Sequence, residues 1–201
     1  MSRAVIITGG TVTDYAYTKN LITKNDTIIC ADSGYDHASA MGITPHVLLG
    51  DLDSIKKEPE QGITKIKFPT DKDYTDTELA LNYAKDKGFE RILLLGAIGT
   101  RMDHTLVNIQ MLARFSNATI INENNKIYTG KNIAISEKTG TYVSLLPMST
   151  CTNVNTKNLQ YQLTNATLQP SYGLSVSNVM VANEATVTVG EGIMTVIVAW
   201  D

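Results

Sequence analysis

The stretch TIICADSGYDHASAMGITPHVLLGDLD, residues 27–53, decides the fold class of this chain. It begins with an apolar run over Thr27–Ala31 and ends with a second apolar run over His46–Gly50. Between the two runs, Gly34–Met41 carries apolar residues at the spacing of a helix face. Apolar strands joined by a helix are typical of a parallel sheet that is covered by helices. The stretch therefore predicts a strand–helix–strand unit of an α/β fold.

The same alternation of short apolar runs and helical segments extends on both sides of this unit, from Ala4 to about Asn122. The further runs are Ala4–Thr8, Thr64–Phe68, Arg91–Leu95 and Thr119–Ile121, and the further helices are Asp76–Lys87 and Met102–Phe115. We therefore expect an N-terminal, mainly parallel α/β sheet domain over residues 1–125.

The second half of the chain has a different pattern. Helical spacing disappears after about Asn125, and Thr, Val, Asn and Ser dominate short alternating runs. These runs are Tyr142–Leu146, Leu159–Leu163, Ala185–Val189 and Met194–Ala199. Alternation with a period of two is typical of antiparallel strands that bury one face. We expect residues 126–201 to form a C-terminal antiparallel β-sandwich domain. The boundary between the two domains is expected within Glu123–Lys131, where Asn, Glu and Lys cluster and Gly130 offers a turn.

The composition excludes several classes of partner. Seventeen lysines and arginines against twenty aspartates and glutamates give a net charge of −3, which offers no field to gather nucleic acid or an anionic membrane. The sequence has no run of about 18 apolar residues that could span a bilayer. Its two cysteines, Cys30 and Cys151, have no metal-ligand spacing. We expect a soluble, cytoplasmic protein that binds neither nucleic acid nor membranes.

Glycines and carboxylates follow five of the expected strands in the first half. They are Gly9-Gly10, Asp32, Asp51-Leu52-Asp53, Asp71-Lys72-Asp73 and Gly96–Gly99. In an open parallel sheet, the carboxyl ends of the strands meet at one edge, and ligands bind at that edge. Carboxylates gathered there repel one another unless a cation lies among them. A site for Mg²⁺, which shares its ligands with substrate phosphates, is therefore expected.

The pair Asp51-x-Asp53 is the strongest metal candidate, and Asp32 and Asp76 are expected at the same edge. The alternative for the pair is a simple turn, because Gly-Asp-x-Asp-Ser is also favourable turn chemistry. The residues from Thr75 to Glu78 match a helix capping box, with Thr75 as the N-cap. Asp76, in the first turn of that helix, suits the helix dipole and could also face a metal ion.

A second polar helix start lies within Gly99–His104. We expect Thr100 to be its N-cap, with Asp103 at the third helical position. Arg101, beside a helix N-terminus and a glycine-containing loop, suits a phosphate group.

Other familiar site motifs do not occur in the sequence. There is no phosphate loop of the G-x-x-x-x-G-K-[ST] type, no G-x-G-x-x-G and no G-x-S-x-G. The histidines do not have the spacing of a metal-ligand set. His37 and His46 are interpreted as surface or packing residues, and the role of His104 stays open.

Taken in order, four motifs resemble those of bacterial thiamine pyrophosphokinases. They are Ala31-Asp32-Ser33-Gly34, Gly50-Asp51-Leu52-Asp53-Ser54, the run DKDYTDTELAL at 71–81 and the run GAIGTRMDH at 96–104. In the second half, Asn158-Leu159-Gln160-Tyr161 lies where that family has Gly-Leu-Lys followed by Trp or Tyr. Gly173-x-x-x-Ser177-Asn178 is similar to the family's Ser-Asn motif. The resemblance covers nearly the whole chain.

The resemblance implies a homodimeric enzyme that transfers the terminal pyrophosphoryl group of ATP to the hydroxyl of thiamine, with Mg²⁺, and releases AMP. It implies metal binding by Asp51, Asp53 and Asp76, which are catalytic together with Asp32. The residues it implies for ATP binding are Asp32, Thr75, Arg101, Asp103 and His104. The residues it implies for thiamine binding, typically across the dimer interface, are Tyr161, Ser177 and Asn178.

Three residues depart from the family's pattern: Thr100 and Asn158 stand where glycine is common, and Tyr161 is the smaller of the two aromatic residues seen at its position. The first departure affects the expected conformation of the phosphate loop, and the second affects the turn before Tyr161. Tyr161 itself has an alternative role as a packing residue between strands. Two other functions stay open: pyrophosphoryl transfer to another hydroxymethyl heterocycle such as a pterin, and a non-catalytic nucleotide- or thiamine-binding module. The second of these would not need the four aspartates.

Overall fold

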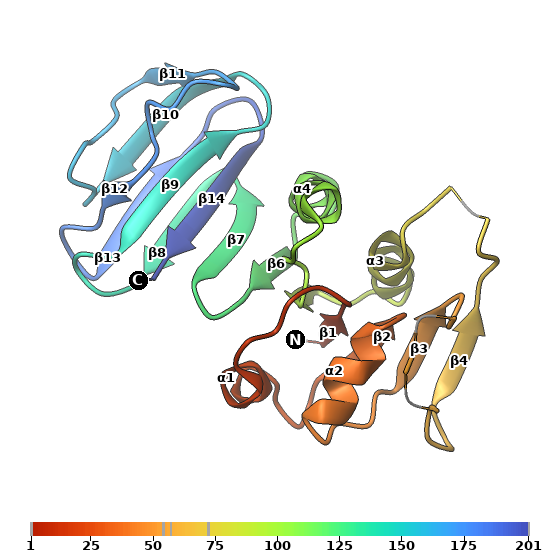
Figure 1. The fold of residues 1–201 in the computed structure, drawn as a ribbon. Helices are drawn as coiled ribbons and strands as arrows, with labels where there is room; N and C mark the ends of the chain where they lie inside the picture. The colour runs from red at the N-terminus through yellow and green to blue at the C-terminus, as the bar shows by residue number, and fades with distance from the viewer. Residues whose placement is uncertain (1, 54, 57, 72, 201) are drawn as a thin grey trace. The chain divides into compact units, whose positions relative to one another are not determined.

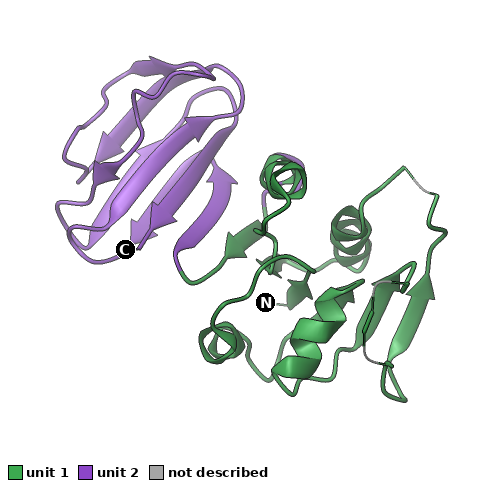
Figure 2. Cartoon of the chain, viewed as in Figure 1, with its two compact units in different colours: residues 1–111, 117–123 green, residues 112–116, 124–201 purple. Residues whose placement is uncertain are grey.

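The computed structural model describes residues 2–53, 55–56, 58–71 and 73–200. The chain forms two compact units, which Figure 2 distinguishes by colour. Unit 1 comprises residues 1–111 and 117–123, and unit 2 comprises residues 112–116 and 124–201. Among the described residues, no helix is both long enough and apolar enough to cross a membrane.

Unit 1 is built on a parallel sheet whose strands pair in the order β6-β5-β1-β2-β3-β4 (Figure 1). Its strands are β1 (Arg3–Ile7), β2 (Thr27–Ala31), β3 (Val47–Gly50), β4 (Thr64–Lys67), β5 (Arg91–Leu95) and β6 (Ala118–Ile121). Its helices are α1 (Tyr15–Asn20), α2 (Gly34–Ala40), α3 (Asp76–Asp86) and α4 (Met102–Met111). Helices α1 and α2 lie on one face of the sheet and α3 and α4 on the other. The α/β prediction for the first half is confirmed.

The core of unit 1 follows from this two-sided cover. In β1, β2 and β5 every residue after the first is buried, and in β3 every residue is buried. Strands buried on both faces are nearly continuous apolar runs, as the sequence pattern of these strands indicates. Because these buried strands are parallel, the polar loops that follow β1, β2, β3 and β5 all lie at the same edge of the sheet.

Unit 2 consists of antiparallel strands, as the alternation in the sequence predicts. One sheet has the order β12-β9-β14-β7 and the other the order β11-β10-β13-β8. The strands are β7 (Asn125–Gly130), β8 (Asn132–Ser136), β9 (Tyr142–Pro147), β10 (Cys151–Lys157), β11 (Ala166–Leu168), β12 (Asn178–Val179), β13 (Glu184–Thr188) and β14 (Met194–Ala199). Buried and exposed residues alternate along β8 and β13. Residues from both sheets share one buried apolar cluster, which is the core of a sandwich.

One predicted strand is wrong, and one observed strand was not predicted. The run Leu159–Leu163 is not a strand: Leu159 forms an isolated bridge with Met180, and the following loop folds back onto β10. In that loop, Thr156 Oγ1 accepts a hydrogen bond of 2.8 Å from the Leu163 N–H. The segment 123–131, in which the domain boundary is expected, contains strand β7, which was not predicted and which pairs with β14 along its whole length. Its buried residues alternate with half-exposed ones, and this alternation was hidden by the polar residues.

Two helices also differ from expectation. Helix α1 was not predicted, because its six residues are too few to show a period; Asp14 is its N-cap and accepts from the Tyr17 N–H at 2.8 Å. Helix α4 ends at Met111 and not at Phe115. The Leu112 carbonyl accepts a hydrogen bond from Thr129 Oγ1 at 2.8 Å. The polypeptide is thereby held to β7 at the point where the helix ends.

Candidate active site

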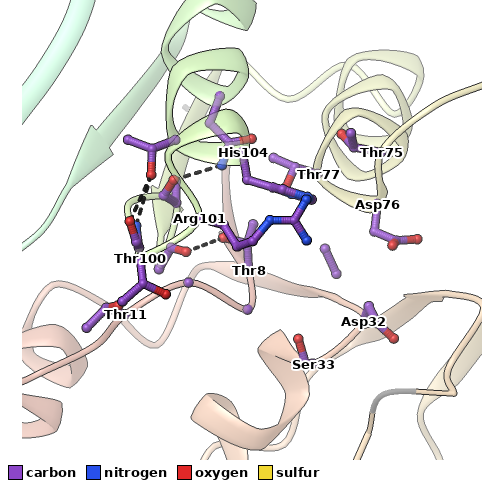
Figure 3. A pocket seen from close by; sticks show the side chains of 18 residues that line it. Thr8, Thr11, Asp32, Ser33, Thr75, Asp76, Thr77, Thr100, Arg101 and His104 are labelled. Carbon is purple, nitrogen blue, oxygen red and sulfur yellow. Dashed lines mark hydrogen bonds between the residues drawn. The ribbon is translucent and has the colours of Figure 1, made fainter.

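A cavity of about 460 Å³ opens at the carboxyl edge of the sheet in unit 1. We call it the strand-end cavity. Its walls are the loops after β1, β2 and β5 and the first turns of α3 and α4 (Figure 3). This volume is within the range of pockets that bind small molecules. The edge at which the sequence pattern predicts ligand binding therefore carries a cavity of suitable size.

Glycines allow the loops around the cavity to approach one another. A Cβ atom at Gly10 would collide with the Gly96 carbonyl oxygen, and one at Gly9 would collide with Ser33 Oγ. The Gly10 N–H donates to the Gly96 carbonyl at 2.8 Å, and Thr8 Oγ1 donates to the same oxygen at 2.6 Å. The backbone itself therefore forms part of the cavity wall.

Asp32, Asp51 and Asp53 form an acidic cluster at the ends of β2 and β3. Each offers a carboxylate oxygen, and the three oxygens lie within 4.8 Å of one another. The backbone of Asp32 has a φ of 47° and that of Leu52 a φ of 66°, values that non-glycine residues rarely adopt. Such strained backbone is concentrated at functional sites.

Asp76 joins this cluster from the start of α3. A Cβ atom at Gly50 would lie 3.1 Å from Asp76 Oδ1 and 3.1 Å from the Asp32 Cβ, so the two side chains flank the same glycine. Figure 3 shows Asp32 and Asp76 on one side of the cavity. The structure thus brings together four aspartates that are up to 44 residues apart in the sequence (76 − 32 = 44).

The electrostatics of the acidic cluster fit a hard divalent cation. A hydrogen bond to Asp51, the negative charge of Asp51, burial and the charge of Asp32 together raise the pKa of the Asp53 carboxyl. A pKa raised by neighbouring carboxylates reports repulsion that a bound cation would relieve. Carboxylate oxygens are the ligands that Mg²⁺ prefers. Ser54 and Lys72, which belong to the quoted motifs, lie outside the described residues.

Thr75 is the N-cap of α3, as predicted, and its Oγ1 accepts from the Glu78 N–H at 3.2 Å. Thr75, Asp76 and Thr77 all line the cavity. The N-terminus of this eleven-residue helix therefore faces the cavity, where its dipole favours an anion.

Arg101 and His104 line the opposite side of the cavity (Figure 3). Arg101 forms a two-pronged ion pair with Asp103, with Nε–Oδ1 at 3.0 Å and a second contact of 2.5 Å to Oδ2. The hydrogen bond from Arg101 holds the pKa of the Asp103 carboxyl well below its usual range. Both side chains are exposed, so the pair is open to exchange with a ligand. Asp103 itself does not line the cavity; it contacts Arg101, which does.

One prediction about this loop is wrong. Helix α4 begins at Met102, and its first hydrogen bond runs from the Thr105 N–H to the Arg101 carbonyl. Arg101, and not Thr100, therefore occupies the N-cap position. Thr100 does not have a positive φ. A threonine in place of the family's glycine therefore needs no unusual backbone.

Two residues of α4 that were not predicted as site residues hold the Gly96–Gly99 loop. Thr105 Oγ1 accepts from the Gly99 N–H at 3.1 Å and lies 3.2 Å from the Gly99 carbonyl. Asn108 Nδ2 donates to the Ala97 carbonyl at 2.7 Å. Both side chains are buried. Thr105 and Asn108 are three positions apart and share the buried face of α4 with Met111, and this spacing was the available signal.

The second-half candidates Tyr161, Ser177 and Asn178 lie together in unit 2. The Asn178 side chain is buried and holds the Tyr161 backbone: its Oδ1 accepts from the Tyr161 N–H at 3.0 Å, and its Nδ2 donates to the Tyr161 carbonyl at 2.7 Å. Tyr161 itself is 67 % exposed, which argues against the alternative that its ring packs in the core. The Ser177 N–H donates to Ser144 Oγ at 3.0 Å.

Asn158 supplies the turn for which the family commonly uses glycine. Its φ is 61°, a left-handed conformation that asparagine tolerates better than most residues. Its Nδ2 also donates to the Glu184 carbonyl at 2.8 Å. The departure from glycine at this position therefore preserves the turn before Tyr161.

Comparison with known proteins gives consistent results for both units. The family model for the thiamin pyrophosphokinase catalytic domain matches residues 18–128, and that for the thiamin pyrophosphokinase vitamin B1 binding domain matches residues 115–194. The thiamine pyrophosphokinase of Bacillus subtilis (strain 168) is 30% identical over 173 residues, which are 80% of this chain and 81% of that protein.

Solved structures are similar over the whole chain. A crystal structure of thiamine pyrophosphokinase from Bacillus subtilis has a TM-score of 0.87 at 24% identity, with 100% of both chains covered. A crystal structure of thiamin pyrophosphokinase from Geobacillus thermodenitrificans has a TM-score of 0.88 at 24% identity, covering 100% of this chain and 98% of that one. At this identity the likeness concerns the fold.

Proposed function

This chain belongs to the thiamine pyrophosphokinase family, and we propose that the strand-end cavity of unit 1 is where it binds ATP and a divalent metal ion. Its activity is the transfer of pyrophosphate from ATP to thiamine, which yields thiamine diphosphate and AMP. The observation that supports the proposed site is the convergence of Asp32, Asp51, Asp53 and Asp76 on one edge of the sheet.

In this reaction, the hydroxyl oxygen of thiamine forms a bond to the β-phosphorus of ATP. The bond from that phosphorus to the oxygen bridging to the α-phosphorus breaks, AMP leaves with the bridging oxygen, and the hydroxyl loses its proton. Phosphoryl chemistry of this kind depends on positioning and on stabilisation of charge, and it needs no protein nucleophile. The site can meet both needs: its carboxylates can hold a cation, and its arginine and helix N-termini can bind phosphate oxygens.

Asp51, Asp53 and Asp76 are the residues that would hold the divalent cation, Mg²⁺ in our proposal, with Asp32 beside them. A bound cation would supply positive charge to the phosphate oxygens. Since these carboxylates come from the end of β3 and the start of α3, two rigid elements fix their positions. The raised pKa of Asp53 supports this assignment, because it results mainly from the neighbouring Asp51 and Asp32 carboxylates, whose repulsion a cation would relieve.

The triphosphate of ATP would contact the other walls of the cavity. The N-terminus of α3 at Thr75 provides N–H groups, and Arg101 would exchange its exposed pair with Asp103 for a phosphate oxygen. His104 lies beside Arg101 on the same wall. In this proposal Asp103 keeps Arg101 oriented until the nucleotide binds.

Unit 2 would bind thiamine through Tyr161, Ser177 and Asn178. The exposed ring of Tyr161 suits stacking on a heteroaromatic cation, and the buried amide of Asn178 holds the backbone of that tyrosine. The match of residues 115–194 to a vitamin B1 binding domain supports this assignment.

We also propose a homodimer with the thiamine site at its interface, in the cytoplasm. Large apolar side chains exposed on unit 2 support an interface; among them are Tyr172, Leu174 and Val181. Cys30 and Cys151 are free thiols, which suits a reducing compartment.

A product assay tests the function. The protein is incubated with ATP, Mg²⁺ and either thiamine or a hydroxymethyl pterin, and nucleotides and acceptors are separated by chromatography. We expect AMP and thiamine diphosphate in equal amounts, and no diphosphorylated pterin. AMP formation with the pterin alone would select the alternative acceptor, and ADP as the nucleotide product would exclude pyrophosphoryl transfer.

Substitution of Tyr161 tests the thiamine site. Because stacking of a cation on an aromatic ring contributes about 1–2 kcal/mol, Tyr161→Ala should weaken thiamine binding roughly tenfold, and Tyr161→Trp should preserve or tighten it. Binding of ATP should stay unchanged in both variants. Fluorimetric titration measures the thiamine dissociation constant, and an unchanged constant in Tyr161→Ala would remove Tyr161 from the site. Loss of activity per chain on dilution would support the interface.

A further inference from the structure

His37 makes two side-chain hydrogen bonds next to the strand-end cavity. Its Nε2 lies 2.8 Å from the Gly10 carbonyl oxygen, and its Nδ1 lies 2.9 Å from the Tyr15 hydroxyl. A carbonyl oxygen only accepts hydrogen bonds, so Nε2 carries the ring proton and donates a hydrogen bond to the Gly10 carbonyl. In the neutral ring, Nδ1 then accepts from Tyr15. The interpretation of His37 as a surface or packing residue is therefore incomplete.

Gly10 is a wall residue of the cavity, and its peptide groups are held on several sides. Its N–H donates to the Gly96 carbonyl at 2.8 Å, and the next N–H, of Thr11, donates to the Ile98 carbonyl at 2.8 Å. These bonds tie the turn after β1 to the loop after β5. The carbonyl of Gly10 is held from a different element, α2, by the His37 side chain.

The orientation of this carbonyl matters for an anionic ligand. A glycine rotates its flanking peptides more freely than any other residue, and without His37 only the bond from the Thr11 N–H to Ile98 would keep the Gly10 carbonyl from turning its negative end into the cavity. There it would oppose the phosphates of a bound nucleotide. The bond from His37 draws the oxygen toward α2, and Tyr15 of α1 fixes the orientation of the imidazole.

We propose that His37 is a positioning residue for the nucleotide, which holds the Gly9–Gly10 turn in the shape that accepts a triphosphate. This inference rests on the proposed function, because the shape of the turn affects nucleotide affinity only if the cavity binds ATP. His37 acts through Gly10 and is not itself a wall residue of the cavity. It determines affinity for ATP and leaves the chemical step to other residues.

Two substitutions of His37 separate positioning from a general structural role. In His37→Gln, the side-chain amide can reach the place of Nε2 and donate to the Gly10 carbonyl. In His37→Asn, the amide is shorter and reaches only the place of Nδ1, near Tyr15. The two variants have similar polarity and both keep α2, so their difference isolates the bond to Gly10.

The experiment measures steady-state kinetics for ATP and calorimetric binding of a non-hydrolysable ATP analogue. His37→Asn should raise the KM for ATP and the dissociation constant of the analogue about three- to tenfold, the effect of one hydrogen bond. His37→Gln should stay within about twofold of wild type, on the same scale. The kcat and the KM for thiamine should be unchanged in both variants.

His46 provides a matched control. It is also a histidine that bonds to backbone, since its Nδ1 accepts from the Ile28 N–H at 3.0 Å, but it precedes β3 at the other end of the sheet. His46→Ala, which removes this acceptor, should lower the melting temperature and leave the KM for ATP unchanged. An equal rise of that KM in His37→Gln and His37→Asn, no rise in either, or a similar rise in His46→Ala would overturn the positioning role. A wild-type protein that forms no AMP would instead reject the proposed function.

Discussion

The two ends of the parallel sheet in unit 1 use the same residue type in opposite ways. At the amino end, Asp26 precedes β2 and meets Arg3 of β1 in a two-pronged ion pair, with distances of 2.8 Å and 2.6 Å. At the carboxyl end, Asp32, Asp51 and Asp53 lie together, with carboxylate oxygens within 4.8 Å of one another. One end pairs its acid with a base, and the other gathers acids.

The pKa values of these acids reflect the contrast. Burial raises the pKa of Asp26, but hydrogen bonds from Arg3 and Thr23 outweigh burial and bring it below its usual value. The neighbouring carboxylates raise the pKa of Asp53. The ionised form of Asp26 is thus favoured by folding, whereas that of Asp53 is disfavoured. The contrast supports the proposal that the carboxyl end serves a ligand, whereas the amino end serves stability.

The largest effect is expected for Asp76→Ala. Its carboxylate belongs to the proposed metal set, so turnover should fall about a thousandfold, the upper range for one preorganised electrostatic contact. The melting temperature should change little, because Thr75 supplies the cap of α3. Initial rates at saturating ATP and Mg²⁺, together with thermal unfolding, measure both quantities. If turnover falls only in proportion to the fraction of protein that is unfolded, Asp76 has a structural role at the start of the helix and not a role in metal binding.

A smaller loss is expected for Asp51→Asn and Asp53→Asn, where the other aspartates of the cluster stay in place. Turnover should fall at least about a hundredfold in each. Without a divalent cation, both variants should be at least as stable as wild type, because a repelling charge has been removed. Rates at saturating substrate and melting curves in a chelator test the two statements. Near-normal turnover in both variants would break the assignment of this edge to metal binding.

The residues of the carboxyl end could be predicted from sequence because strand polarity alone decides where they lie. Once Thr27–Ala31 and His46–Gly50 are recognised as parallel strands, Asp32 and Asp51 must lie at the same edge. No statement about side-chain contacts was needed for this prediction.

Other features depend on contacts between distant segments, and the sequence pattern does not contain them. His37 was interpreted as a surface or packing residue because its partners, Gly10 and Tyr15, lie 27 and 22 positions away. The run Leu159–Leu163 alternates like a strand, yet Asn178 holds the Tyr161 backbone outside any ladder. In both cases a side chain bonds to a backbone group that local spacing cannot identify.

At the amino end, Asp26→Asn should cost stability and not activity. The substitution removes the charge that pairs with Arg3, while the Asp26 side chain is only 3% exposed. Loss of a charged, buried hydrogen-bond partner should lower the free energy of unfolding by about 2 kcal/mol. Urea unfolding measures this change, and turnover per folded molecule should equal that of wild type. A loss of turnover with unchanged stability would remove the contrast between the two ends.

The pH dependence of the same variant sharpens the comparison. Because folding lowers the pKa of Asp26 from 3.8, the wild type binds fewer protons at this site when folded than when unfolded. Its contribution to stability is therefore present above pH 3.8 and is lost as the pH falls through the lowered pKa. The stability difference between wild type and Asp26→Asn should shrink on acidification. A difference that grows toward low pH would contradict the pairing with Arg3.

The smallest effect is expected for Thr75→Ala, which tests whether every polar residue at the carboxyl end serves the ligand. Thr75 lines the cavity, but its Oγ1 also accepts from the Glu78 N–H and so caps α3. Loss of this cap should lower the free energy of unfolding by about 1 kcal/mol, while turnover falls far less than in Asp76→Ala. Thr75→Ser, which keeps the hydroxyl, should retain wild-type stability. If Thr75→Ala instead loses turnover as severely as Asp76→Ala at unchanged stability, the hydroxyl acts on the substrate, and the capping role is secondary.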